Sequence, residues 1–192
     1  MRQAAIERKT NETWVKVSLD LDDKGKSHIR TGIGFLDHML ELFAFRAGIN
    51  LQVECDGDLH IDGHHTTEDV GIVIGQAIAR SLGDKSGIKR YGHISLPMDE
   101  SLVHCALDIS GRAFLVFNAE MPSQRAGDLD TELVEEFFRG FTFNSGMTLH
   151  INVAYGKNTH HIIEGIFKAF GCALKEAITI TGEGIPSTKG II

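Results

Sequence analysis

The chain has 192 residues, of which 42% are hydrophobic and 23% are charged, a balance typical of a globular protein of one domain or two small fused domains. Its net charge of −7 argues against general nucleic-acid binding, although a few local cations could still hold a small anionic ligand. No apolar run is long enough to cross a membrane, and three scattered cysteines without a Cys-x-x-Cys motif favour reduced thiols in a cytoplasmic protein.

The apolar pattern predicts strands and helices in alternation. Apolar residues at every second position are typical of half-buried strands, and apolar residues at helical spacing are typical of amphipathic helices. In chain order, the predicted elements are a strand over 15–21, a helix over 35–43, a strand over 49–55, a helix over 64–82, an irregular polar loop over 118–131, a helix over 133–141, a strand over 147–153, a helix over 160–178 and an irregular tail.

The chain contains an internal repeat. Residues 12–22 align with 100–110, residues 36–53 align with 134–151, and a His-His-x-x-Glu motif recurs in the same order. We therefore predict a duplication, with a first half over 1–92 and a second half over 93–192. Each half reads as strands, helix, strand, helix, which predicts an α+β fold of sheets with helices packed on one face, fused as two similar layers.

The repeated motif has the composition of a metal site. It reads His64-His65-x-x-Glu68 in the first half and His160-His161-x-x-Glu164 in the second. Histidine and glutamate three residues apart share one helix face, whereas adjacent histidines diverge by about 100° around the helix axis. Each motif would therefore give a His-Glu pair to one metal and its other histidine to a second metal. A single His-His pair is usually a surface feature, but two copies at matched positions favour two metal centres.

Position 38 on the first predicted helix is a further candidate ligand. His38 aligns with Glu136 in the second half, and both side chains can bind a metal. Glu136 also follows Glu135, and two adjacent glutamates are usually a solvated pair. The other five histidines have no matched partner, and we expect them to be structural or surface residues: His28, His60, His93, His104 and His150.

Basic residues could provide an anion site. Lys168 is spaced to share a helix face with His160 and Glu164, whereas its counterpart in the first half is Ile72, so the halves are not identical. The tail sequence "PSTKG" offers a hydroxyl, a lysine and a glycine-flanked backbone, which is a weak signal for a phosphate site when taken alone.

Six segments resemble the imidazoleglycerol-phosphate dehydratase family: "FLDHML", "DGHHTTEDVGI", "MDES", "SGMTLH", "GKNTHHIIEGIFKAF" and "PSTKG". The resemblance extends over essentially the whole chain and includes the duplication. It implies two split β-α-β halves, a 24-subunit assembly with active sites completed at subunit interfaces, and two Mn²⁺ ions per chain. The implied reaction is the dehydration of D-erythro-imidazole-glycerol phosphate to imidazole-acetol phosphate in histidine biosynthesis.

The resemblance also implies roles for individual residues. The ligands of one metal would be His38, His65, Glu68 and His160, and those of the other would be His64, His161 and Glu164. Many family members carry His where this chain has Glu136, so its ligation to the second metal is an open expectation. Glu12 and Lys168 would contact the substrate, and the phosphate would be held by Arg90, Arg112, Ser187 and Lys189. The residues expected to take part in catalysis are Glu12, Glu164, His64 and His161, with either glutamate able to move the proton.

Two other functions remain open from the residues alone. A di-metal phosphoester hydrolase would need metals about 3.5–4 Å apart with a bridging carboxylate, and no carboxylate stands in an evident shared position. A metal-storage or metal-sensing protein would explain the histidines but not Lys168 or the basic tail. Mixed histidine and carboxylate ligation fits Mn, Fe or Zn, so only the resemblance implies manganese.

Overall fold

The computed structural model describes residues 2–192, which form ten strands and four helices. The elements are β1 (Gln3–Lys9), β2 (Thr13–Asp20), β3 (His28–Arg30), α1 (Gly34–Ala47), β4 (Asn50–Gly57), α2 (His64–Leu82), β5 (Tyr91–Met98), β6 (Ser101–Asp108), β7 (Phe114–Asn118), β8 (Arg125–Ala126), β9 (Leu129–Asp130), α3 (Leu133–Ser145), β10 (Thr148–Tyr155) and α4 (Thr159–Ile178). No helix among these residues combines the length and apolarity that a membrane span requires.

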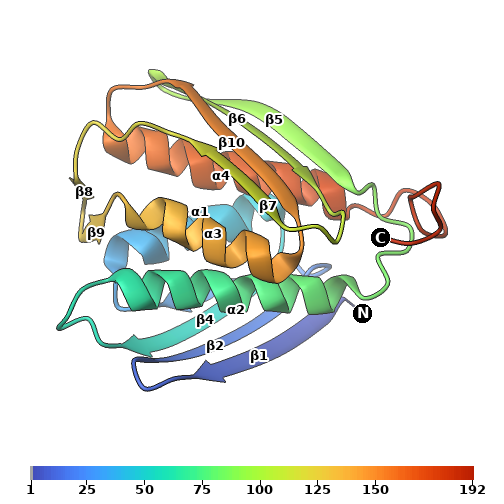
Figure 1. Cartoon of the computed structure of the whole chain (residues 1–192), viewed down its shortest axis with the longest axis horizontal. Helices are drawn as coiled ribbons and strands as arrows, with labels where there is room; N and C mark the ends of the chain where they lie inside the picture. The colour runs from blue at the N-terminus through green and yellow to red at the C-terminus, as the bar shows by residue number, and fades with distance from the viewer. Residues whose placement is uncertain (1) are drawn as a thin grey trace.

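Two four-stranded sheets of the same topology enclose the four helices (Figure 1). The strand orders are β1-β2-β4-β3 and β5-β6-β10-β7, and in each sheet only the last pair is parallel. Helix α2 packs on β1 and β2, and α4 packs on β5 and β6. The predicted α+β class, with helices on one face of each sheet, is confirmed. The matched strand orders support the proposed duplication, and β5 begins at Tyr91, beside the predicted division between residues 92 and 93.

The strands bury one face because their apolar residues alternate. In β2, Val15 and Val17 are fully buried, and they pair with the buried Cys55 and Val53 of β4. Lys16 lies between them in the sequence and is exposed, as the twofold period of a strand requires. The sheet therefore presents a continuous apolar surface to α2, the helix that carries the first histidine motif.

Two glycines allow helices from different halves to cross closely. A Cβ atom added to Gly75 of α2 would lie 2.5 Å from the carbonyl oxygen of Phe141 in α3. A Cβ atom added to Gly171 of α4 would lie 2.6 Å from the carbonyl oxygen of Phe43 in α1. Phe43 and Phe141 are aligned in the sequence repeat, so the two crossings are related by the same pseudo-twofold symmetry.

We expect Gly75→Ala and Gly171→Ala to destabilise the fold, because each methyl group would meet backbone rather than a movable side chain. Overpacking of this kind costs roughly 1–3 kcal/mol per site, and each kcal/mol corresponds to about 2–4 °C in melting temperature for a chain of this size. Gly182→Ala is the control, since no atom lies within 4 Å of its added Cβ. Calorimetric melting temperatures that are equal for all three variants would contradict the tight crossings.

The segment over 118–131 is more ordered than predicted. It contains the β8–β9 hairpin, whose turn includes Gly127 at φ +59°. Asp128 accepts hydrogen bonds from the backbone N–H groups of Gly34 at 2.7 Å and Phe35 at 2.8 Å, and so caps the start of α1. Burial opposes ionisation of Asp128, but these two hydrogen bonds outweigh it and lower its pKa. The hairpin thereby fixes the end of the helix that carries His38.

Candidate active site

The histidines of both motifs lie in the first turn of a long helix, near its N-terminus as predicted. The side chain of Asn158 caps α4 by accepting hydrogen bonds from the N–H groups of His160 at 2.9 Å and His161 at 3.4 Å. Asp62 accepts a hydrogen bond of 2.8 Å from the N–H of His64 at the start of α2. These contacts fix the backbone from which the imidazoles project.

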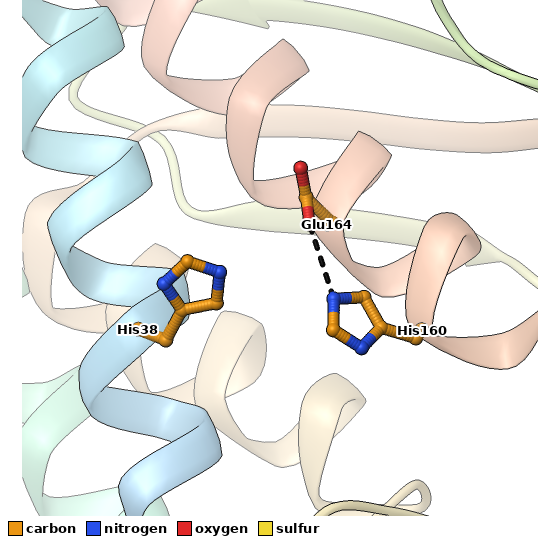
Figure 2. Close-up of side chains that lie close together, drawn as sticks. All are labelled: His38, His160 and Glu164. Carbon is orange, nitrogen blue, oxygen red and sulfur yellow. Dashed lines mark hydrogen bonds and ion pairs between the residues drawn. The ribbon is translucent and has the colours of Figure 1, made fainter.

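His38, His160 and Glu164 form a group of candidate metal ligands (Figure 2). One donor atom of each lies within 4.8 Å of the donor atoms of the other two, and no other group of this kind occurs in residues 2–192. His38 comes from α1 and the other two from α4, and His160 Nε2 lies 3.1 Å from Glu164 Oε2. Two imidazoles and one carboxylate suit Mn, Fe or Zn, so this donor set fits a divalent metal.

Glu164 is buried beside a cation. It is 8% exposed and forms an ion pair with Lys168, one turn further along α4. Burial alone would raise the pKa of Glu164, but the hydrogen bond and charge of Lys168, together with His160, hold it below its usual value. Lys168 therefore lies on the motif face of the helix, as predicted, and keeps the carboxylate ionised next to the histidine group.

The second histidine of each motif contacts a different carboxylate. His161 Nδ1 lies 2.7 Å from Glu100 Oε2, and His65 Nδ1 lies 2.9 Å from Asp58 Oδ2. These hydrogen bonds raise the pKa of both imidazoles. The same contact with His161, followed by the backbone N–H of Asn158, lowers the pKa of Glu100 to about 2. Each of these imidazoles is therefore hydrogen-bonded to its own carboxylate and lies outside the His38 group.

Glu12 lies on the other side of His65. Its Oε2 atom is 3.9 Å from His65 Nε2, and its side chain is 55% exposed. It makes no closer side-chain contact within the part of the chain that the structure describes. Of the two glutamates predicted to move a proton, Glu12 is thus the one without a tight partner.

The first motif is more open than the second. His64 Nε2 lies 3.9 Å from Glu68 Oε2, and both side chains are at least 40% exposed. Glu136 lies 3.4 Å from Arg139, which also contacts Glu135 at 2.8 Å. Within one chain, the structure therefore does not gather His64, Glu68 and Glu136 as tightly as their counterparts in the second half.

The four predicted phosphate-binding residues line one cavity of about 730 Å³: Arg90, Arg112, Ser187 and Lys189. Arg90 donates two hydrogen bonds to Asp108, at 2.7 and 3.1 Å, and a third to the carbonyl of Pro186 at 3.1 Å. The tail is therefore held against the end of β6 by a paired arginine. The hydrogen bond with Asp108 raises the pKa of Arg90.

Two cations of this cavity remain available to a ligand. The side chain of Arg112 is 70% exposed and lies 3.8 Å from Asp108, so it is only loosely paired. Lys189 is exposed, and its backbone N–H is fixed by the hydroxyl of Ser187 at 3.2 Å. Since Asp108 offsets Arg90, the cavity keeps an excess of positive charge suited to a phosphate.

The cavity and the histidine group lie at opposite ends of α4, and Figure 1 shows the C-terminal tail at the end of α4 that is far from its first turn. His160 is in the first turn, whereas the backbone N–H of Arg90 donates to the carbonyl of Ala177 near the last turn. A helix of 20 residues spans roughly 30 Å at about 1.5 Å per residue. One small molecule cannot touch both sites of the same chain.

Asp58 and Glu100 are site residues that the sequence analysis did not identify. The repeat alignment offered a signal for Glu100, because it places that residue opposite Glu12. Asp58 had no such signal, since it is one of three aspartates in "DGDLHID" and its contact with His65 depends on how the loop folds.

Comparison with known proteins gives one consistent family. The family model described as imidazoleglycerol-phosphate dehydratase matches residues 31–174. A protein of that name from Listeria welshimeri is 58% identical, with all of both chains aligned, and one from Oceanobacillus iheyensis is 55% identical over 99% of both. The crystal structure of the Staphylococcus aureus enzyme superposes with a TM-score of 0.85 at 47% identity, covering 93% of this chain and 99% of that one. The Pyrococcus furiosus structure, in complex with (S)-C348, gives the same TM-score at 34% identity, covering 97% and 100%.

Proposed function

The chain belongs to the imidazoleglycerol-phosphate dehydratase family and is the hydro-lyase that dehydrates imidazoleglycerol phosphate in histidine biosynthesis, and we propose that it works with two Mn²⁺ ions bound by its duplicated motifs. The observation that carries the metal proposal is the convergence of His38, His160 and Glu164 from two helices. The free state of all three cysteines supports a cytoplasmic location.

The pseudo-twofold symmetry supports a particular division of the ligands. The first metal would take His38, His160 and Glu164, and the second would take their repeat counterparts, Glu136, His64 and Glu68. The fourth ligands would be His65 for the first metal and His161 for the second, each from a neighbouring chain, because neither belongs to the compact group in its own chain. This division differs from the one implied by the resemblance only in exchanging Glu68 and Glu164.

The separation of the two sites supports a composite active site. A substrate with an imidazole ring and a phosphate is far shorter than α4, so the phosphate cavity of one chain would have to lie against the motif end of another. A closed homo-oligomer, such as the proposed 24-mer, would provide this contact repeatedly.

The metals would supply Lewis acidity toward the imidazole ring and the hydroxyl groups of the substrate. Glu12 is the better candidate for removing the carbon-bound proton, because it is exposed and only loosely paired with His65, whereas Glu164 is held by Lys168 and His160. Glu12 would take the carbon-bound proton and then return it to the departing hydroxyl group, which leaves as water and restores the Glu12 carboxylate. Arg112, Lys189 and Ser187 would anchor the phosphate and so fix the reacting carbons relative to Glu12.

The test is turnover of imidazoleglycerol phosphate, followed by the absorbance of the enol product. Protein loaded with Mn²⁺ should be active and hold two ions per chain, and chelation should abolish activity until Mn²⁺ is restored. Phosphate release without enol formation would favour a phosphoester hydrolase. Tight metal binding without any turnover would favour a storage or sensing role.

Glu136→Gln should lower the Mn²⁺ occupancy of one site and leave the other unchanged, because a neutral amide is a poorer ligand for Mn²⁺ than a carboxylate. Glu135→Gln is the matched control, since Arg139 contacts both glutamates and only one of them is the proposed ligand. Elemental analysis after dialysis at limiting Mn²⁺ measures the occupancy. Equal occupancy in the two variants would remove Glu136 from the ligand set.

A further inference from the structure

We propose that Asp58 and Glu100 are positioning residues that hold the imidazoles of His65 and His161 with the proton on Nδ1, so that Nε2 is the donor available to a metal. The inference rests on the proposed metal function and adds two residues to it. Both carboxylates contact the Nδ1 atom and not Nε2, at 2.9 Å for Asp58 and 2.7 Å for Glu100.

Glu100 is fixed at both of its oxygens. Its Oε1 atom accepts hydrogen bonds from the backbone N–H groups of Lys157 at 3.2 Å and Asn158 at 2.8 Å, while Oε2 meets His161. An ionised carboxylate can only accept hydrogen bonds, so the contact requires a proton on Nδ1 of His161. The turn between β5 and β6 is thereby joined to the start of α4, and the imidazole cannot rotate freely.

Asp58 is held in the loop between β4 and α2. Its backbone N–H donates to the carbonyl of Glu12 at 3.1 Å, and its side chain is 17% exposed. Its second oxygen, Oδ1, is buried without a hydrogen-bond partner among residues 2–192. Burying an unpartnered oxygen is unfavourable, and the other oxygen of this carboxylate contacts His65, which points to a role in orienting that imidazole.

The two halves achieve the same contact from different places. Asp58 comes from the loop before its helix, whereas Glu100 comes from a turn between two strands. Glu12, the repeat counterpart of Glu100, lies near Nε2 of His65 rather than Nδ1. Both halves therefore place a carboxylate on Nδ1, but the two carboxylates do not occupy aligned positions of the sequence repeat. A carboxylate on the far nitrogen of a ligating histidine fixes its tautomer and increases its basicity.

Glu100→Gln and Asp58→Asn test this role with little change in shape. At residue 100 the N–H groups of Lys157 and Asn158 hold the amide oxygen, so the amide presents its N–H group to Nδ1 and favours the opposite tautomer. At residue 58 the amide replaces the carboxylate with a neutral partner, which lowers the basicity of His65. Loss of such a carboxylate typically weakens metal binding about 10- to 100-fold. We expect each variant to weaken one of the two Mn²⁺ sites by this factor and the double variant to weaken both, as measured by electron paramagnetic resonance titration of free Mn²⁺.

Asp56→Asn and Glu120→Gln are the controls, because both residues are exposed carboxylates and neither has a hydrogen bond or ion pair to an imidazole within the described chain. They should leave both affinities unchanged. Variants at 58 and 100 that bind two Mn²⁺ ions with wild-type affinity would overturn the proposal.

The tautomers can also be read in the metal-free wild type by nitrogen NMR on ¹⁵N-histidine-labelled protein at a pH where the imidazoles are neutral. Nδ1–H forms at His65 and His161 support the proposal, and Nε2–H forms overturn it, even if a variant fails to fold. This measurement is independent of the proposed function, whose failure would appear separately as wild-type protein that binds no Mn²⁺.

Discussion

Replacing His160 with alanine should lower the turnover of imidazoleglycerol phosphate by at least about a thousandfold, because a metal contributes several kcal/mol to the transition state and each 1.4 kcal/mol is worth about tenfold. His160 is one of the three proposed ligands that a single chain brings together, so its loss leaves His38, Glu164 and the proposed His65 of a neighbouring chain, and we expect the first site to lose its ion on dialysis. Metal content should fall from two ions per chain to about one.

His150→Ala is the control for this substitution, because His150 is an exposed residue of β10 on the opposite face of the sheet from the helices. It should change neither metal content nor turnover. If His160→Ala retained two Mn²⁺ ions per chain and normal turnover, the group of His38, His160 and Glu164 would not be a metal site.

Arg112→Ala and Lys189→Ala should each raise the KM for imidazoleglycerol phosphate about 10- to 100-fold, since a charge-assisted hydrogen bond to phosphate is worth roughly 1.5–3 kcal/mol. These are the two cations of the cavity that are free of a tight ion pair. Metal content should remain normal, because the cavity lies at the far end of α4 from the histidine group.

Arg80→Ala provides a control for loss of positive charge, because Arg80 is exposed on α2 and does not line the phosphate cavity. It should leave KM unchanged. A dephosphorylated substrate that bound the wild type as tightly as the phosphorylated one would contradict the assignment of the cavity.

The helices that carry the motifs could be predicted because apolar periodicity and helical spacing are local features of the sequence. Apolar periodicity gave the helix that begins at His64, and the internal repeat gave its partner in the second half. The same repeat aligns His38 with Glu136 from sequence alone. Lys168 was predicted on the motif face because helical spacing alone determines which residues share that face.

The remaining features depend on tertiary contacts that periodicity does not encode. The capping of α1 by Asp128 joins residues more than 90 positions apart, and the two-residue strands beside it are too short to show an alternating pattern. The contact of Asp58 with His65 depends on the course of an irregular loop. The proximity of Glu164 to His38 depends on the crossing of α1 and α4, which sequence spacing does not encode; the resemblance implied Glu164 as a ligand of the other metal.

Sequence patterns could not predict the phosphate cavity for a different reason. Its residues come from the start of β5, the loop after β6 and the tail, and no single segment has a phosphate motif strong enough to stand alone. Only the family resemblance indicated that these residues share a site. In the structure, Arg90 pairs with Asp108 and donates a hydrogen bond to the carbonyl of Pro186, which holds the tail at the cavity.

The composite active site is tested most directly by mixing two inactive variants. His160→Ala chains and Arg112→Ala/Lys189→Ala chains would be dissociated with chelator, combined in equal amounts and reassembled with Mn²⁺. If each site takes its metal ligands from one chain and its phosphate cavity from another, about a quarter of the sites regain both intact parts. At a substrate concentration near the wild-type KM, the mixture should then recover about a quarter of wild-type enol formation, while each variant alone shows almost none. A mixed assembly, verified by two affinity tags, with no more activity than its parents would contradict the composite site.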